Sequence, residues 1–260
     1  MKEKFAAISG ASSGLGKSFA QQLAKQGHNL LLISLPNENL STLCYELELQ
    51  YNIKAICYET DLSIKENVWL LTDWINKKYS INILINNAGV GGTKKIEEVS
   101  TDYVERIIRV NVLATTILIH RLLPNLKENN EAYILNVSSL AAFSPMGYKT
   151  VYPASKSFIY SFSRGLYQEL KETNVHVGVV SPGPMKTNGE ITRRIEKQGF
   201  FGRLTSRKPD DVAAYCLKQL RRKKPVIRVN LLSLIVLHVL PTWITLPILS
   251  NKMKGELNVE

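Results

Sequence analysis

Short runs of consecutive apolar residues alternate with longer amphipathic stretches along most of this chain. The apolar runs predict seven buried strands, at residues 4–9, 29–34, 53–58, 81–86, 131–138, 174–181 and 225–229. Between them, helical periodicity predicts helices near residues 15–26, 38–50, 64–79, 99–128 and 152–173. Strands that are apolar at every position, rather than at every second one, belong to parallel sheets covered on both faces. The pattern therefore predicts an α/β fold with a doubly wound, mostly parallel sheet.

A glycine-rich turn follows the first predicted strand. Residues 10–16 read Gly-Ala-Ser-Ser-Gly-Leu-Gly, and a helical run begins directly after them. A strand, a glycine turn and a helix in this order bring backbone N–H groups at a helix N-terminus onto a pyrophosphate. A glycine triplet alone is also compatible with an ordinary tight turn.

Tyr152 and Lys156 lie one helical turn apart on the same helix face. An ammonium group at this distance favours the phenolate, so we expect it to lower the pKa of Tyr152 from its usual value near 10. Such a tyrosine can give a proton to a carbonyl oxygen, or take one from an alcohol, while hydride moves at the carbon. The same spacing also occurs by chance in surface helices.

Five further motifs fall in register with these two. They are Asp61-Leu62-Ser63, Asn86-Asn87-Ala88-Gly89, Asn111-Val112, Asn136-Val137-Ser138-Ser139 and the segment from Ser181 to Thr187. In this order and spacing, residues 3–228 resemble the short-chain dehydrogenase/reductase family. The apolar run at 229–249 is similar to the C-terminal extension of the subgroup that includes bacterial oxidoreductases and keto-lipid reductases. The resemblance implies a single Rossmann domain over residues 1–229 with the active site built in. It also implies a homodimer or homotetramer.

The same resemblance implies four catalytic residues, Asn111, Ser139, Tyr152 and Lys156. Tyr152 would be the general acid in reduction and the general base in oxidation, and Lys156 would hold the ribose hydroxyls. Ser139 would hydrogen-bond the substrate oxygen, whereas Ser138 is one position out of register. Asn111 interrupts an apolar helical run. It is either a satisfied buried amide or, as we favour, a helix distortion that holds a water of a proton relay.

Cofactor-binding residues are implied along most of the chain. They are Gly10, Ser12, Ser13, Gly14, Leu15, Gly16, Ser34, Asp61, Leu62, Asn87, Ala88, Gly89, Tyr152, Lys156, Pro182, Gly183 and Thr187. Relatives that prefer NAD tend to carry an acid at position 34, and those that prefer NADP a basic residue at position 35 or 13. This chain has none of these, since it carries Ser34, Leu35 and Ser13. Because Ser34 does not repel a 2′-phosphate and can donate a hydrogen bond to it, we expect a modest preference for NADP(H).

Composition and charge narrow the choice of partners. Three cysteines and four histidines lack metal-ligand spacing, which predicts no metal site and favours a reducing, cytoplasmic location. No secretory signal is recognised at the N-terminus. The net charge is +11, with basic residues concentrated late, as at 221–224. No recognition motif or aromatic ladder accompanies them, so nucleic-acid binding is disfavoured.

Residues 229–249 are nearly all apolar and carry no charged side chain, but contain Pro241 and Pro247. This run is a cover for the substrate side or a subunit contact, a helix on a membrane surface, or a membrane span. Pro241 should divide it into two helical pieces, each too short for a bilayer of ~30 Å. We expect residues 230–260 to be an appendage that packs on its own body or a partner subunit. Peripheral membrane contact through 230–250 is the alternative.

These features together predict an NAD(P)(H)-dependent oxidoreductase of the carbonyl reductase or alcohol dehydrogenase type. Its small-molecule substrate would be an apolar ketone or an acyl-chain carbonyl compound. This substrate class follows from the apolar tail and from residues 191–204, which resemble the family's variable lid. The rival hypothesis is a non-catalytic, cofactor-binding regulator on the same fold. The complete set of four catalytic residues argues against it, because a regulator needs no proton-transfer group.

Overall fold

All seven strands expected from the apolar runs are present, and they form one parallel sheet. The computed structural model describes residues 3–185 and 207–257. The strands are β1 (Lys4–Ser9), β2 (Asn29–Ser34), β3 (Ala55–Glu59), β4 (Ser80–Asn86), β5 (Ala132–Val137), β6 (Val175–Val180) and β7 (Val226–Ile227). Their order in the sheet is β3-β2-β1-β4-β5-β6-β7. The order reverses between β1 and β4, which makes the gap between their carboxyl ends the expected ligand position.

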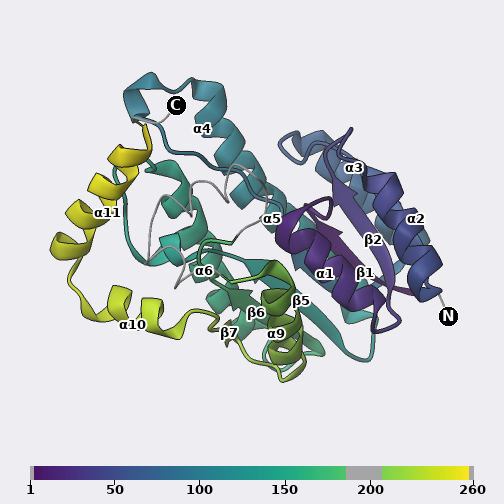
Figure 1. Cartoon of the computed structure of the whole chain (residues 1–260). Helices are drawn as coiled ribbons and strands as arrows, with labels where there is room; N and C mark the ends of the chain where they lie inside the picture. Colours follow the sequence, from purple (N-terminus) through teal and green to yellow (C-terminus); the bar gives the residue numbers. More distant parts are fainter. Residues whose placement is uncertain (1–2, 186–206, 258–260) are drawn as a thin grey trace.

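Helices cover both faces of this sheet (Figure 1). One face carries α1 (Gly14–Ala24), α2 (Leu40–Tyr51) and α9 (Pro209–Arg221). The other carries α3 (Lys65–Lys78), α5 (Thr115–Lys127) and α6 (Val151–Glu169). Successive residues of β1 alternate between two cores, with Ala6 and Ile8 on one side and Phe5 and Ala7 on the other. This burial on both faces explains why the strands are apolar at nearly every position.

Helix α9 was absent from the sequence prediction, although its first turn carries ordinary helix-start signals. Pro209 occupies the first turn, and Asp210 and Asp211 follow it. The helix packs along α1, where Ser18 Oγ donates a hydrogen bond to Asp210 Oδ1 at 2.5 Å. Its buried side chains, including Val212 and Leu217, complete the core on that face of the sheet.

The single helix expected near residues 99–128 is three segments in the structure. An α-helix, α4 (Thr101–Ile108), leads into a π-helical turn, η2 (Arg109–Ala114), and then into α5. In the described chain, the stretch Thr101–Lys127 is the one helical run whose length and apolar composition would suit a membrane span. Its α5 part packs on the sheet, however, with Leu118 and Leu122 buried in the core. We therefore interpret it as a core helix.

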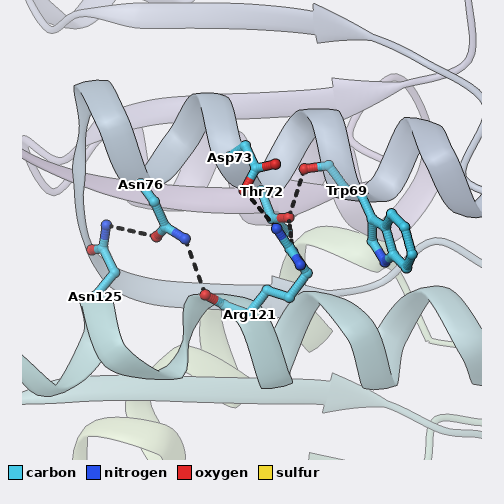
Figure 2. A network of polar contacts seen from close by, with 6 residues as sticks. All are labelled: Trp69, Thr72, Asp73, Asn76, Arg121 and Asn125. Atoms are coloured by element: carbon cyan, nitrogen blue, oxygen red, sulfur yellow. Dashed lines mark hydrogen bonds and ion pairs between the residues drawn. The ribbon is translucent and has the colours of Figure 1, made fainter.

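Polar side chains fasten α5 to α3 (Figure 2). Arg121 Nε donates to Thr72 Oγ1 at 2.8 Å, and its guanidinium pairs with Asp73 at 2.5 Å. One turn along, Asn76 Nδ2 donates to the carbonyl of Arg121 at 3.1 Å, and Asn125 Nδ2 donates to Asn76 Oδ1 at 3.2 Å. These contacts fix the position of α5, and with it the π-helical turn that precedes it.

The apolar tail forms two helices, α10 (Leu231–Val239) and α11 (Thr242–Leu257). The chain breaks at Leu240, which is extended and precedes Pro241, as the sequence predicted. Pro247 lies inside α11. Figure 1 shows the two helices as an arm at the end of the molecule opposite α2.

Candidate active site

A cavity of about 730 Å³ opens at the carboxyl ends of the strands, where the sheet order reverses. Most of the predicted site residues line it, namely Gly10, Ser12, Ser13, Gly14, Leu15, Ser34, Asp61, Leu62, Asn87, Ala88, Gly89, Ser139, Tyr152, Lys156, Pro182 and Gly183. Gly16 and Asn111 are buried and do not line the cavity. Thr187 and the expected lid, residues 191–204, lie outside the described residues. Residues from distant motifs thus meet around one space.

The glycine turn is shaped so closely that side chains would not fit. Gly10 and Gly14 adopt positive φ values of 64° and 53°. A Cβ on Gly16 would lie 1.9 Å from the carbonyl oxygen of Gly10. Asn87 braces the turn from β4, since its Nδ2 donates to the carbonyls of Ser9 at 3.1 Å and Gly10 at 3.0 Å.

The N-terminus of α1 borders the cavity directly after this turn. Its N-cap residue, Ser13, makes no side-chain capping bond, so the first N–H groups of α1 are not capped by that hydroxyl. A helix N-terminus of this kind attracts a pyrophosphate, and the glycine turn lets the phosphates approach the backbone. The residues present therefore fit a dinucleotide.

Tyr152 lies in the first turn of α6 and forms a hydrogen bond with Ser139. Burial raises the pKa of the Tyr152 phenol, and the Ser139 hydrogen bond lowers it by less. The expected lowering of this pKa by Lys156 is therefore wrong for the structure. The reason is that the buried phenolate loses its hydration, and the Lys156 ammonium stands 5.9 Å from the Tyr152 ring centre.

Lys156 is itself buried, with 4% of its surface exposed. Its Nζ donates to the carbonyl of Val137 at 2.9 Å, and burial lowers the pKa of the amine to about 8. Both groups of the Tyr–Lys pair are thus pushed toward their neutral forms. The lowered pKa brings Lys156 closer to neutral pH, whereas the raised pKa keeps the Tyr152 phenol protonated there.

The two neighbouring serines of the β5 motif do different things. Ser138 is buried, and its Oγ donates to the backbone carbonyl of Lys156 at 2.8 Å, which fastens β5 to α6. Ser139 faces the cavity and reaches Tyr152. The contact of Ser139 with a substrate oxygen stays a prediction.

Asn111 lies within the π-helical turn and is 1% exposed. Its Oδ1 accepts from the N–H of Val90, and its Nδ2 donates to the carbonyl of Val90 and to Ser155 Oγ. The side-chain amide is thus satisfied, and the helix is distorted at this residue. The water of a proton relay stays a prediction. A Cβ on Gly89 would lie 3.1 Å from Lys156 Nζ and 3.3 Å from Asn111 Oδ1, so the loop packs tightly on both residues.

Several residues that line the cavity were not assigned to the site from the sequence, although Leu35 and Ser138 had been considered. They are Leu35, Glu38, Thr60, Val90, Gly91, Gly92, Thr93, Lys94, Tyr103, Arg106, Val110, Val137, Ser138, Lys149 and Met185. The glycine pair at 91–92 was a usable signal, since a Cβ on Gly91 would lie 2.5 Å from Tyr152 Cδ2. Lys149 places its ammonium 5.1 Å from the Tyr152 ring centre. Within the described ranges, no group of three His, Cys, Asp or Glu side chains is placed to hold a metal ion.

Comparison with known proteins gives consistent matches. The family model described as short chain dehydrogenase matches residues 4–198. An uncharacterised oxidoreductase of Staphylococcus epidermidis is 31% identical over 188 residues, which cover 72% of this chain and 80% of that protein. A very-long-chain 3-oxoacyl-CoA reductase of Anas platyrhynchos is 31% identical over 182 residues, covering 68% of this chain and 58% of the relative.

Solved structures agree with the fold. A short-chain dehydrogenase from Sphingobium yanoikuyae, in complex with NADPH, superposes with a TM-score of 0.77 at 26% identity and covers 87% of each chain. A short chain dehydrogenase/reductase from Burkholderia phymatum, in complex with NAD, gives a TM-score of 0.80 at 23% identity and covers 92% of each chain. At that lower identity, the second match speaks for the fold alone.

Proposed function

The chain belongs to the short-chain dehydrogenase family and is a nicotinamide-dependent oxidoreductase, and we propose that it interconverts an apolar ketone, or an acyl-chain carbonyl compound, with its alcohol. The observation that carries this proposal is the buried Tyr152 phenol, hydrogen-bonded to Ser139 in a cavity that fits a dinucleotide. The 31% identity of this chain to a very-long-chain 3-oxoacyl-CoA reductase supports an acyl-chain substrate.

When bound, the nicotinamide cofactor would supply or accept the hydride. Burial keeps Tyr152 protonated, so this phenol is ready to protonate the carbonyl oxygen in reduction. Ser139 hydrogen-bonds the same oxygen and stabilises the charge that develops on it. Lys156 would hold the ribose hydroxyls, and Asn111 keeps the loop after β4 against Lys156. A water held at the π-helical turn would relay protons to Lys156.

The choice between the two nicotinamide cofactors rested on Ser34 and Leu35, which led us to expect a modest preference for NADP(H). Ser34 is 4% exposed, and its Oγ donates to the carbonyl of Leu35 at 3.0 Å. The hydroxyl that was expected to bind a 2′-phosphate is therefore already engaged. The related structure solved with NADPH supports binding of a nicotinamide dinucleotide to this fold without selecting one for this chain.

For residues 230–260 we propose an appendage beside the substrate end of the cavity. Three hydrogen bonds support this: Ser144 Oγ to Thr245 Oγ1 at 3.1 Å, the N–H of Gly147 to Ser250 Oγ at 2.8 Å, and Thr93 Oγ1 to Glu256 at 3.0 Å. These loops flank Tyr152. The arm therefore supplies apolar surface near the place where a long substrate chain would leave the cavity.

The outer side of this arm exposes apolar side chains, which bear on the partners and the location of the protein. Val239, Trp243 and Ile248 are exposed, Trp243 by 76%. An apolar face of this kind fits a second subunit of a homodimer or homotetramer, or peripheral contact with a membrane, in a cytoplasmic protein. The rival hypothesis of a non-catalytic regulator leaves the Tyr152–Ser139 hydrogen bond without a purpose.

The test is turnover of NADH and NADPH with ketones of increasing chain length. We expect kcat/KM to rise with chain length in the full chain, because more apolar surface is buried. Removal of residues 230–260 should lower kcat/KM for long substrates more than for short ones, and it should promote aggregation. Loss of activity that is independent of chain length would contradict the proposed role of the arm. Absence of turnover with every carbonyl compound and alcohol would contradict the proposed reaction.

A further inference from the structure

Glu38 stands in the cavity wall beside the glycine turn, at a position that the sequence patterns did not mark. It comes from the connection between β2 and α2 and lines the same cavity as Ser12. Ser12 Oγ donates a hydrogen bond to its carboxylate. This hydrogen bond links the β2–α2 connection to the glycine turn, where the phosphates are expected.

The backbone on both sides of Glu38 holds it in this place. Asn37 and Asn39 have positive φ values of 66° and 55°. Asparagine is one of the few residues that adopt this left-handed conformation readily. Two such residues around Glu38 bend the connection back toward the glycine turn, and Asn39 then serves as the N-cap of α2. The position of the carboxylate is therefore part of the local fold.

In the described part of this wall, no positively charged side chain accompanies Glu38. The β1–α1 turn and the β2–α2 connection give the cavity Gly10, Ser12, Ser13, Gly14, Leu15, Ser34, Leu35 and Glu38. Among the described residues that line the cavity, the cations are Lys94, Arg106, Lys149 and Lys156, which belong to other segments. Ser34 directs its hydroxyl to its own backbone. An added phosphate in this wall would meet a carboxylate from these two segments and no ammonium or guanidinium.

We propose that Glu38 makes this site prefer NAD(H) over NADP(H), which reverses the preference expected from Ser34 and Leu35. The inference rests on the proposed function, because it assumes that a nicotinamide dinucleotide occupies the cavity. A carboxylate accepts hydrogen bonds from ribose hydroxyls, whereas it repels the negative charges of a 2′-phosphate. Glu38 is exposed to solvent, so salt screens this repulsion.

Direct titration of the full chain with NADH and with NADPH tests the proposal without any substrate. At low salt, the dissociation constant for NADPH should exceed that for NADH by about tenfold, the equivalent of ~1.4 kcal/mol. Glu38→Gln keeps the shape but removes the charge, so it should tighten NADPH binding and close most of this gap. Added salt should narrow the gap in the wild type and have little effect on it in the variant.

Glu46→Gln is the matched control, because it removes the same charge from an exposed position of α2 that does not line the cavity. It should leave both dissociation constants unchanged. Tighter binding of NADPH than NADH by the wild type, or an unchanged ratio in Glu38→Gln, would overturn the role of Glu38. Failure of both dinucleotides to bind would instead overturn the proposed function.

Discussion

The side-chain amide of Asn111 pairs with both backbone groups of Val90. Its Oδ1 accepts the N–H of Val90 at 2.8 Å, and its Nδ2 donates to the carbonyl of the same residue at 2.9 Å. The same Nδ2 also donates to Ser155 Oγ at 2.9 Å. One buried side chain therefore joins the π-helical turn, the loop after β4 and the first turns of α6. These three segments surround Lys156.

Replacing Asn111 by alanine should reduce both stability and turnover. The change leaves both backbone groups of the half-buried Val90 without their side-chain partner, which costs about 1–3 kcal/mol. It also releases the loop that packs on Lys156. Urea unfolding and kcat per folded molecule measure the two effects. Asn129→Ala is the control, because Asn129 is a buried amide that donates to the carbonyls of Ile81 and Asn125, away from the cavity. Equal loss of kcat in both variants would reduce Asn111 to a structural residue.

Tyr152→Phe should abolish most turnover while leaving the dinucleotide affinity close to normal. The ring and its packing remain, but the group that exchanges the proton is gone, and general acid–base catalysis typically contributes ~10²–10⁴-fold. Tyr160→Phe removes a hydroxyl from the same helix at a site outside the cavity, where it accepts from Arg164. That variant should turn over like the wild type. Normal kcat in Tyr152→Phe would refute the assigned acid.

The pKa of Lys156 predicts how stability changes with pH. Burial lowers this pKa from 10.5 to about 8, so between these values the unfolded chain binds more protons than the folded chain. Stability should therefore rise with pH in this window, and the cost of burying the ammonium is fully present below pH 8. Between pH 7 and 10, the wild type should gain roughly 2–3 kcal/mol relative to Lys156→Met.

Denaturant unfolding of the wild type and Lys156→Met at several pH values measures this difference. The raised pKa of Tyr152 acts with the opposite sign, since the folded chain keeps that proton longer, but only above about pH 10, where an exposed tyrosine titrates. The comparison therefore stops at pH 10. Parallel stability curves for the two proteins would mean that Lys156 titrates normally in the folded chain.

Two glycine substitutions should affect different properties, one the binding of the dinucleotide and the other the stability of the fold. Gly16→Ala would place a Cβ 1.9 Å from the carbonyl oxygen of Gly10, so the turn must open and dinucleotide binding should fail. Gly165 lies inside α6 with nothing within 4 Å of an added Cβ. Gly165→Ala should stabilise the chain by about 0.5–1 kcal/mol, because alanine favours the helix, without changing affinity. Titration and thermal unfolding of both variants check this pair.

The sheet could be predicted closely from the sequence, because strands buried on both faces leave continuous apolar runs. The bounds of β1 and β2 agree with the prediction to the residue. The π-helical turn could not be predicted from periodicity. It depends on Asn111 finding partners 21 and 44 residues away in the chain, which a local pattern does not record.

The candidate site was predictable where its residues follow strands directly, as at Gly10, Asn87 and Ser139, because parallel strands bring their carboxyl ends together. Glu38 was missed because left-handed backbone at Asn37 and Asn39, and not a motif, turns it into the cavity. The predicted direction of the Tyr152 pKa shift was wrong for a related reason. Spacing shows a neighbouring ammonium but does not show how completely both groups are buried.

The polar attachment of α11 has a consequence for how this protein unfolds. Each of its hydrogen bonds, to Ser144, Gly147 and Thr93, contributes only about 1 kcal/mol. Met253 is the large apolar side chain of α11 that is buried, whereas Trp243 is 76% exposed and gains little from burial. The arm can therefore detach in a local opening while the sheet stays folded. Backbone amides of α11 would exchange with deuterium long before those of β1. On warming, the loops beside Tyr152 would lose their support first, and catalysis would cease below the melting temperature of the sheet.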